Sequence, residues 1–505
     1  MGEAMTEVPA RAHPHALPLR IAKKYNISNK YFYMDVWPFQ APILYVFDPA
    51  LSQQVTQEHS LPKFEGLKPF MIHLAGPGDM VSSDGAHWKK WRSIFNPGFA
   101  ASHLMTLAPF IVDKATIFTQ RLTGRAERGE VFRLEEDATR LTVDIIGKLT
   151  LDLELDTQES ENEMVTAFRD QVHLLPNGGP LEVLKMWQPT GIWKRWRNGR
   201  IMRSYIGNVL DQRFAKEAQT ANGSAGGKKQ RKRAILDLAL EGYKSQQEVG
   251  GQFKASAGMD TEFREAAIAQ IRTFIFAGHD TTSSTICYAT YMLQKNPDCL
   301  AKIRKEHDDI LGPLESTPEA IKNDPHVLNK LEYTLAVIRE TLRMWPAASS
   351  TRTGEAGYTV RDPKTGEALP SEDMLVWVVH FAQHRHPDIW GNDAHEFHPE
   401  RFLPENVGKL PEGAWRPFER GPRNCIGQDL ALLETKIILA LVLRRFSFKP
   451  AFDSLEELKN DGSYYSKEED WKKGKQDIDE EEAYQILLGA AKPREGMPMR
   501  VKEML

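Results

Sequence analysis

With 505 residues the chain is long enough for a large hydrophobic core, and its formal net charge of -4 creates no global field that would recruit nucleic acid. Hydrophobic residues make up 41% and charged residues 27%, as in an ordinary globular protein. Only three cysteines occur, Cys287, Cys299 and Cys425, which excludes the dense disulfide framework of a small secreted scaffold.

Residues 1–30 are predicted to form a polar leader. The opening stretch, MGEAMTEVPARAHPHALPLR, contains neither the apolar centre of a signal peptide nor the roughly 20 apolar residues that a spanning helix needs. The sequence as written therefore predicts no transmembrane anchor.

The segments that follow alternate between strand-like and helical patterns. Aromatic and β-branched residues around a proline predict two strands within Tyr31–Phe47, and a second strand-like region covers GYTVRD and DMLVWVVHF. Between these regions Leu104–Met344 is mostly helical, and a helical pattern returns after Gly427. The sequence therefore predicts a mainly α protein with small β-sheets. Because the strand signals are split between the two ends, we expect one domain over residues 1–505.

Two segments are predicted to be surface insertions in this domain. Residues 220–233, TANGSAGGKKQRKR, are glycine-rich and then basic, which is typical of a solvated loop; a nuclear-localisation or anion-binding patch is the alternative. Residues 455–482 are rich in charges of both signs. Neither segment divides the chain into parts that would fold independently.

Cys425 stands alone in FERGPRNCIGQDLALLE, between Gly421 and Gly427 and just before a helical pattern. At a helix N-terminus, unpaired N-H groups and the helix dipole stabilise a thiolate. No histidine in this stretch would serve as the base of a nucleophilic cysteine, and no short Cys or His spacing marks a zinc site. The residues leave two alternatives, a thiolate ligand of haem iron and an inert buried thiol.

A long helical segment, Ile268–Leu293, has a polar centre. Ala277 and Gly278 are small enough to open a groove, and Asp280 and Thr281 place a carboxyl and a hydroxyl group beside it. In an otherwise apolar helix such groups need a purpose. The alternative is a helix N-cap within DTTSS, and the sequence alone does not separate the two.

Five motifs, in order along the chain, resemble those of the cytochrome P450 family. FERGPRNCIG matches the family's haem-binding signature in full, and WKKWR, AGHDTT, ETLR and FHPERF precede it. The resemblance runs from Tyr31 onward. It implies the cytochrome P450 fold, a single large domain around a buried haem b (iron protoporphyrin IX). It also indicates a eukaryotic oxidoreductase of the fungal type that serves specialised metabolism.

The resemblance assigns the cofactor contacts residue by residue. Cys425 is expected to be the axial thiolate ligand of the iron, where it promotes O-O cleavage. Phe418 is expected on the proximal face of the porphyrin and Arg423 beside a propionate, because buried carboxylates must be neutralised. The other residues expected around the cofactor are Trp88, Arg92, Arg352, Gly421, Gly427, Ala277 and Gly278.

The resemblance also implies a route for protons. Thr281 is expected to hold a water, and Asp280 is expected to connect that water to bulk solvent. This pair favours a monooxygenase that hydroxylates or epoxidises an apolar small molecule with O2. A same-fold isomerase or dehydratase without net oxygen insertion is the alternative, and the pair argues against it. A thiol hydrolase and a haem-binding sensor are alternatives from other classes.

A structural lock is implied near the haem. Glu340 and Arg343 have the spacing of an ion pair on one helix face, and Arg401 is the expected third partner. His395 and His398 flank this lock, and we do not expect them to bind a metal.

Electrons are expected to come from a separate NADPH-cytochrome P450 reductase. The chain has no GxGxxG motif after a strand and no flavodoxin-like extension. A basic docking face on the cysteine side of the haem would attract an acidic flavoprotein. The residues expected to form it are Lys89, Lys90, Arg92, Arg416 and Arg420.

The substrate is expected to bind above the haem in an apolar pocket. The residues expected to line it are Phe70, Met71, Ile72, Leu74, Phe274, Ala277, Ala348 and Ser349.

Outside the pocket, Leu181–Arg200 mixes tryptophans with basic residues, as is typical of a membrane interface. Its members are Trp187, Trp193, Trp196, Lys185, Lys194, Arg195, Arg197 and Arg200. An ordinary helix pair with partly buried tryptophans is the alternative. We therefore expect peripheral membrane contact, and a location at the endoplasmic reticulum membrane surface or in the cytoplasm.

Overall fold

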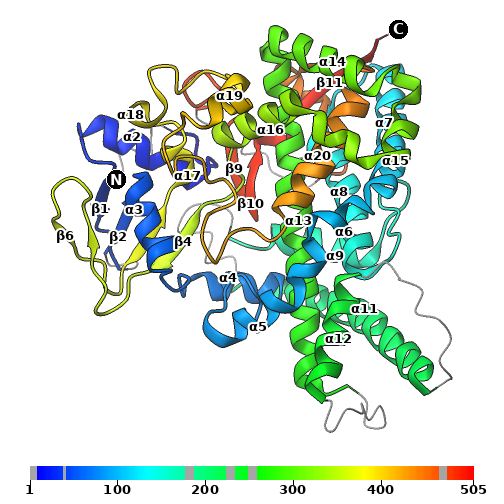
Figure 1. Ribbon diagram of the computed structural model, residues 1–505, viewed down its shortest axis with the longest axis horizontal. Coiled ribbons are helices and arrows are strands. Elements are labelled where there is room, and N and C mark those ends of the chain that lie inside the picture. The colour runs from blue at the N-terminus through cyan, green and yellow to red at the C-terminus, as the bar shows by residue number, and fades with distance from the viewer. Residues whose placement is uncertain are drawn as a thin grey trace.

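The computed structural model describes residues 8–37, 41–176, 187–222, 234–247, 259–463, 465 and 475–504. Helices fill one side of the molecule, and the largest sheet lies on the other side, near the N-terminus (Figure 1). The described α-helices are α2 (Leu17–Lys24), α3 (Pro49–Gln53), α4 (Leu67–Leu74), α5 (Gly85–Phe95), α6 (Ala101–Met105), α7 (Ala108–Arg128), α8 (Leu134–Leu151), α9 (Glu163–His173), α11 (Pro189–Asn222), α12 (Ile235–Gln247), α13 (Thr261–Lys295), α14 (Pro297–Leu311), α15 (Thr317–Asn323), α16 (Glu332–Met344), α17 (His380–Gln383), α18 (Pro387–Trp390), α19 (Pro404–Val407) and α20 (Gln428–Val442). The mainly α prediction is confirmed.

The sheets are small, as predicted, and the described strands form four of them. They are β1 (Tyr31–Met34), β2 (Ile43–Val46), β3 (Phe132–Arg133), β4 (Ser350–Thr353), β5 (Val360–Arg361), β6 (Ala368–Leu369), β7 (Leu375–Val378), β8 (Phe446–Pro450), β9 (Gln485–Leu488), β10 (Ala490–Pro493) and β11 (Pro498–Glu503). The largest sheet has the order β1-β2-β7-β4, in which only β2 and β7 run parallel. Strands that are distant in sequence share sheets, since β2 pairs with β7 and β3 pairs with β11.

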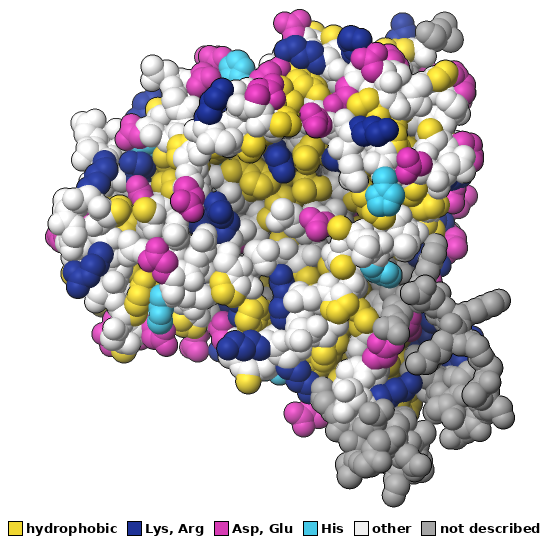
Figure 2. Space-filling view, viewed as in Figure 1, with side chains coloured by type: hydrophobic (Ala, Val, Ile, Leu, Met, Phe, Trp, Pro, Cys, Tyr) yellow, Lys and Arg dark blue, Asp and Glu magenta, His cyan; other side chains and the backbone are white. Residues whose placement is uncertain are grey.

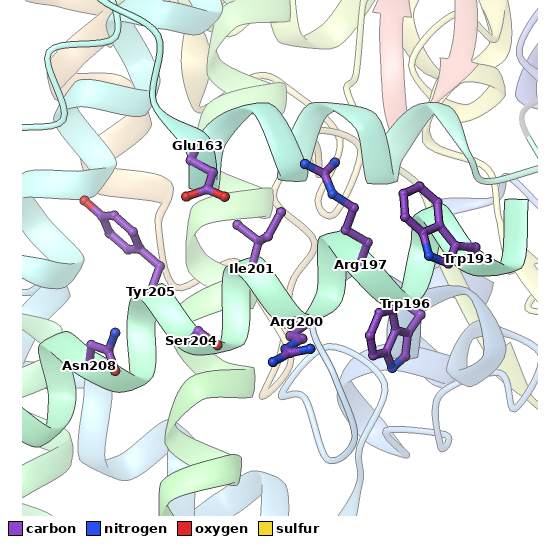
Figure 3. A pocket seen from close by; sticks show the side chains of 9 residues that line it. All are labelled: Glu163, Trp193, Trp196, Arg197, Arg200, Ile201, Ser204, Tyr205 and Asn208. Carbon is purple, nitrogen blue, oxygen red and sulfur yellow. The ribbon is translucent and has the colours of Figure 1, made fainter. Parts of the chain in front are cut away.

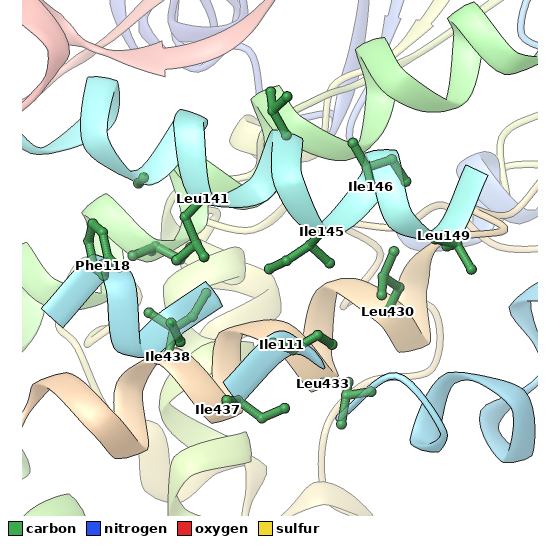
Figure 4. Close-up of a cluster of buried hydrophobic side chains, with 14 of the residues drawn as sticks. Ile111, Phe118, Leu141, Ile145, Ile146, Leu149, Leu430, Leu433, Ile437 and Ile438 are labelled. Atoms are coloured by element: carbon green, nitrogen blue, oxygen red, sulfur yellow. The ribbon is translucent and has the colours of Figure 1, made fainter. Parts of the chain in front are cut away.

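The central helix α13 begins at an N-cap, where the Asp260 side chain accepts a hydrogen bond from the Phe263 N-H. It packs against α8, α16 and α20. A buried cluster joins α7, α8 and α20 beside it, and Figure 4 shows its members Ile111, Phe118, Leu141, Ile145, Ile146, Leu149, Leu430, Leu433, Ile437 and Ile438. On α20, residues 430, 433 and 437 recur at helical spacing, so one face is apolar. Each fully buried side chain of this kind contributes about 1.5–3 kcal/mol.

The leader packs onto the fold in its described part. His13 and His15 are buried, and the His13 N-H donates to the Gln485 carbonyl. Of the first predicted insertion, residues 220–222 end α11, and residues 223–233 lie outside the described residues. In the second, Leu455 and Tyr465 are buried, so that its described part is not confined to the surface.

The face shown in Figure 2 carries scattered charges of both signs, and hydrophobic side chains gather near its centre, close to where Figure 1 places α16 and β10. Among the described residues no helix combines the length and apolarity needed to cross a membrane.

Candidate functional site

The loop before α20 closes tightly on itself. The Cys425 N-H donates to the Phe418 carbonyl at 2.8 Å. Gly421 has a φ of +82°, and a Cβ atom there would lie 2.5 Å from the Thr56 carbonyl oxygen, so the position needs glycine. Gly427 has an ordinary φ of -88°, and a Cβ atom there would lie 3.9 Å from the Cys425 sulfur. Glycine at 427 therefore keeps the space beside the sulfur free.

Cys425 carries exposed surface, yet enough protein surrounds it for burial to raise the pKa of its thiol. Its sulfur therefore faces space inside the fold. The Gly427 N-H and the Arg92 charge oppose the effect of burial but do not cancel it. The N-H at the start of α20 thus favours the thiolate, as expected, although burial has the larger effect on the pKa. A metal ion that binds the sulfur would deprotonate it directly.

A surplus of cations lies close to this loop. Lys63 and Arg352 face each other across a β-bridge, which places both side chains on the same side of the chain. Burial lowers the pKa of Lys63 to about 7, with further lowering by Arg352 and Arg423. Two acids, Glu419 and Asp84, act on Lys63 and Arg352. The Asp84 carboxylate accepts from the Lys63 backbone N-H at 3.0 Å and lies 2.9 Å from Arg423.

Arg352 is fully buried, and only its Nη1 has a partner, the Leu61 carbonyl at 3.2 Å. Its Nε and Nη2 atoms are buried without a hydrogen-bond partner among the described residues. Arg423 stacks over the Trp88 ring, 4.4 Å from its centre, and burial lowers the pKa of Arg423 to about 10. Unpaired buried guanidinium groups are costly, so this arrangement favours an anionic ligand.

Arg92 bonds to the Cys425 loop itself. Its two terminal nitrogens donate to the Asn424 carbonyl at 2.8 Å and to the Asn424 side chain at 2.9 Å. Arg92 thereby ties α5 to the loop beside the sulfur.

The polar centre of α13 divides between two sides of the helix. Ala277 is exposed within a buried run, and the Thr281 hydroxyl donates to its carbonyl at 2.8 Å. Gly278 instead packs against α8, since a Cβ atom there would lie 2.9 Å from Ile146. The expectation that Gly278 opens a groove is therefore wrong. DTTSS lies inside α13, so the N-cap alternative is also wrong.

The Asp280 side chain lies inside the protein. It is 1% exposed, and its Oδ1 lies 2.7 Å from Lys492 Nζ and 3.0 Å from His279 Nε2. Burial alone would raise the pKa of Asp280, but His279 and Lys492 outweigh it and hold the pKa below its usual range. Asp280 is a buried carboxylate, with no direct path to bulk solvent through its own surface.

The expected lock is present. Arg343 makes two bonds to Glu340, at 2.7 and 2.8 Å, and both side chains are fully buried. Arg401 reaches Glu340 at 3.7 Å, and its closer partner is Asp393 at 2.7 Å. The His398 ring contacts the Glu396 carboxylate at the surface, at 2.9 Å.

The expected docking face needs one correction. Arg416 is buried against Glu419 and Thr56. The other four residues of that face, Lys89, Lys90, Arg92 and Arg420, carry exposed surface.

In the expected pocket, Phe274 is a core residue that packs against Phe95 and Phe99. Met71 and Leu74 are also buried in the core, whereas Ile72, Ala277 and Ala348 carry exposed surface.

No sequence motif identified four buried or partly buried charged residues of the site and its surroundings: Lys63, Glu135, Glu434 and Lys492. A glutamate inside the apolar run ALLETKIILALV was the one available signal, and Glu434 is indeed buried there, 2% exposed. Burial raises the pKa of Glu434 to about 8, and the bond to Thr282 on α13 opposes this.

Comparison with known proteins identifies the family. The family model for cytochrome P450 matches residues 6–468. The chain is 34% identical over 505 residues to cytochrome P450 monooxygenase polC of Polytolypa hystricis, covering 98% of this chain and 85% of that relative. It is 34% identical over 516 residues to cytochrome P450 monooxygenase acrF of Aspergillus aculeatus, covering 98% of both. The chain belongs to the cytochrome P450 family.

A crystal structure of a cytochrome P450 (CYP102L1) has the same fold, with a TM-score of 0.71 at 21% identity, covering 97% of this chain and 99% of that one.

The family implies a haem with cysteine thiolate ligation, and the residues of this chain fit it. Haem b carries two carboxylates, which match the unpaired nitrogens of Arg352 and the surplus of cations at Lys63 and Arg423. Cys425 supplies the one accessible thiol among the three cysteines.

Proposed function

We propose that the chain is a haem-thiolate monooxygenase that hydroxylates or epoxidises an apolar small molecule of specialised metabolism. One observation carries the proposal: the site combines an accessible Cys425 thiol at the start of α20 with a buried Arg352 guanidinium that has two nitrogens without a partner among the described residues. The names of the relatives polC and acrF support the reaction class.

Bound haem would supply the centre at which O2 is reduced and one oxygen atom is activated. The chain would hold this group through the Cys425 sulfur and through Arg352, Arg423 and Lys63 around its carboxylates. Thr281 would present a hydroxyl on the exposed side of α13, where it holds a water for proton transfer. The reaction consumes O2, two electrons, two protons and a C-H bond, and releases an alcohol and water.

The test is the absorption spectrum of the reduced, CO-bound protein. We expect the red-shifted main band that only thiolate-ligated haem gives. A haem protein with an unshifted band would contradict the thiolate, and a colourless protein would favour the thiol hydrolase. A same-fold isomerase would show the band but consume no NADPH during turnover.

Electrons would come from a separate NADPH-cytochrome P450 reductase. This reductase would dock on the basic side chains of Lys89, Lys90 and Arg420. These three remain accessible on or near the loop that precedes α20 and on α5. Charge reversal of Lys89 and Lys90 is expected to slow NADPH oxidation mainly at low salt, since screening weakens surface attraction.

The first turns of α11 would contact a membrane surface. Trp193 and Trp196 are more than half exposed, at 57% and 59%. They line a groove of about 500 Å³ with Arg197, Arg200 and Glu163 of α9. In Figure 3 Arg197 points from α11 toward α9, whereas Trp196 and Arg200 point the other way. Arg195 is 7% exposed and so drops out of the expected patch, and Lys185 lies outside the described residues.

Exposed tryptophans beside arginines suit a headgroup interface, and each basic residue adds about 1 kcal/mol near an anionic surface. Co-sedimentation with phosphatidylserine vesicles is expected to fall when Trp193 and Trp196 are replaced by alanine, and to fall at high salt. Equal binding of the double variant would show that this patch is not the contact. Such contact would fit the endoplasmic reticulum membrane surface.

A further inference from the structure

A buried chain of alternating charges lies behind Asp280, on the side of α13 that faces β10 and α8. Lys492 on β10 bridges two carboxylates: its Nζ is 2.7 Å from Asp280 Oδ1 and 2.8 Å from Glu135 Oε1 on α8. The exposed fractions of Asp280, Glu135 and Lys492 are 1%, 2% and 6%. Three elements that are distant in sequence therefore share one ammonium group.

A small polar cavity of about 20 Å³ adjoins this chain. That volume is enough for one water molecule. Its lining residues are Glu135, Glu136, Thr139, Arg169, Val172, His173, His279, Asp280, Tyr465, Leu488 and Lys492. The cavity therefore links the buried carboxylates of α8 and α13 to the side chains of α9.

Asp280 Oδ2 has no hydrogen-bond partner among the described residues, although it is buried. Gly489, at the turn between β9 and β10, has a φ of +75°, and a Cβ atom there would lie 3.2 Å from this oxygen. Glycine therefore leaves Oδ2 approachable. A buried carboxylate oxygen needs a donor, and the neighbouring cavity has room for one.

The outer end of the network reaches the surface. Glu136 and Arg169 form an ion pair there, with side chains 18% and 21% exposed. Protons from solvent can reach Glu136, whereas Asp280 has almost no exposed surface. Between Glu136 and Asp280 lie the polar side chains of Glu135 and Lys492 and the small cavity described above.

We propose that Lys492 is a positioning residue of the proton route: it holds the Asp280 carboxylate at the inner end of a polar path that begins at Glu136 and Arg169. Asp280 accepts a proton at Oδ2 from a water in the cavity and passes it toward the water on Thr281. The path supplies the two protons that each O2 consumes with two electrons. The proposal rests on the monooxygenase function, since only oxygen reduction draws protons across α13.

A purely structural ammonium would instead tie α8, α13 and β10 together and have no effect on proton transfer. The two roles differ when the charge is removed. K492M leaves Asp280 without its closest cation, so the pKa of Asp280 rises in the direction that burial favours, with His279 as the remaining group that opposes the rise. K492R keeps a cation that is able to bridge both carboxylates. K492Q removes the charge but keeps donors, and serves if K492M does not fold.

K114M is the matched control. Lys114 is 5% exposed and bridges two carboxylates, Glu154 at 3.3 Å and Asp156 at 2.7 Å, on another side of the fold. Glu154 and Asp156 are 56% and 45% exposed, so K114M removes a buried ammonium without leaving a buried carboxylate unpaired and without touching α13.

The first readout is the infrared C=O band of a protonated carboxyl, recorded as a difference spectrum against wild type. We expect K492M to gain a band that the added substitution D280N removes, and K492R and K114M to gain none. The second readout is NADPH oxidation per haem with excess reductase, in H2O and D2O. We expect K492M to slow it about tenfold and enlarge the solvent isotope effect, short of the roughly 10²–10⁴ of a lost acid.

The CO-bound spectrum is recorded first for every variant. If wild type lacks the shifted band, the proposed function fails. If the band is present and K492M matches K114M in both readouts, Lys492 is only structural and the inference is overturned.

Discussion

Two charged regions of the fold differ in how their charges are balanced. Around Arg352, Arg423 and Lys63 cations exceed acids, and two guanidinium nitrogens of Arg352 have no partner among the described residues. Behind α13 the charges alternate, with Lys492 between Asp280 and Glu135. A buried charge without a partner is costly, and a paired one breaks even at best. The first region is therefore built for an anion from outside, and the second is complete within the chain.

The largest expected effect is that of replacing Cys425, the expected iron ligand in the first of the two regions. C425A is expected to abolish the shifted CO band, because no other thiol is accessible. C287A and C299A are the matched controls and should retain the band, since both residues are buried away from the site. A shifted band in C425A would remove the assignment of the ligand.

The second prediction separates catalysis from folding on α13. T281A is expected to keep the CO band while a larger share of the NADPH consumed appears as H2O2, because it removes the hydroxyl that we propose to hold a water. Peroxide yield per NADPH measures this. An unchanged yield would limit Thr281 to its bond with the Ala277 carbonyl.

The third prediction tests the comparison itself through stability. K492M leaves two buried carboxylates without their shared cation and is expected to lower the free energy of unfolding by about 3–5 kcal/mol. R352M removes an unpaired charge and is expected to leave the haem-free chain as stable as wild type, or more so. Denaturant titration measures both, and an equal loss in the two variants would end the distinction.

R352M is also expected to weaken haem retention by about tenfold to a hundredfold, the value of a lost bond between charged groups. Haem transfer to apomyoglobin measures this, and retention equal to wild type would place the carboxylates elsewhere.

The fourth prediction concerns Lys63. Its pKa is about 7 in the folded chain and 10.5 in the unfolded chain, so between these pH values the unfolded chain binds more protons. The haem-free chain should therefore gain stability as pH rises from 7 to 10.5. K63M should flatten that part of the profile, and an unaltered slope would show that Lys63 stays charged.

The last prediction has the opposite sign and a similar expected size, because the pKa shifts of Glu434 and Lys63 are about equally large. Glu434 has a pKa of about 8 when folded and 4.5 when unfolded, so the folded chain binds more protons between these values. Stability from this group should be present below pH 4.5 and lost as pH rises through 8. E434Q should remove that slope, and thermal unfolding across the range measures it.

Local strings of sequence were enough for the class of fold and for part of the site. Cys425, Gly421 and Arg423 lie within ten residues of one another, and a tight loop needs its residues in fixed order. The same holds for Glu340 and Arg343, which helical spacing brings together. Strands and helices were predictable because apolar periodicity is itself local.

Only the tertiary structure decided which groups meet from distant parts of the chain. Glu135 and Lys492 are 357 residues apart in sequence and join at one ammonium group. Lys63 reaches Arg352 through a bridge between remote segments. Burial likewise removed Arg416 and Arg195 from predicted surfaces, since the pattern of a helix or loop does not state which neighbour will cover it. Long-range packing sets these charges and their partners, and no single stretch of sequence contains that information.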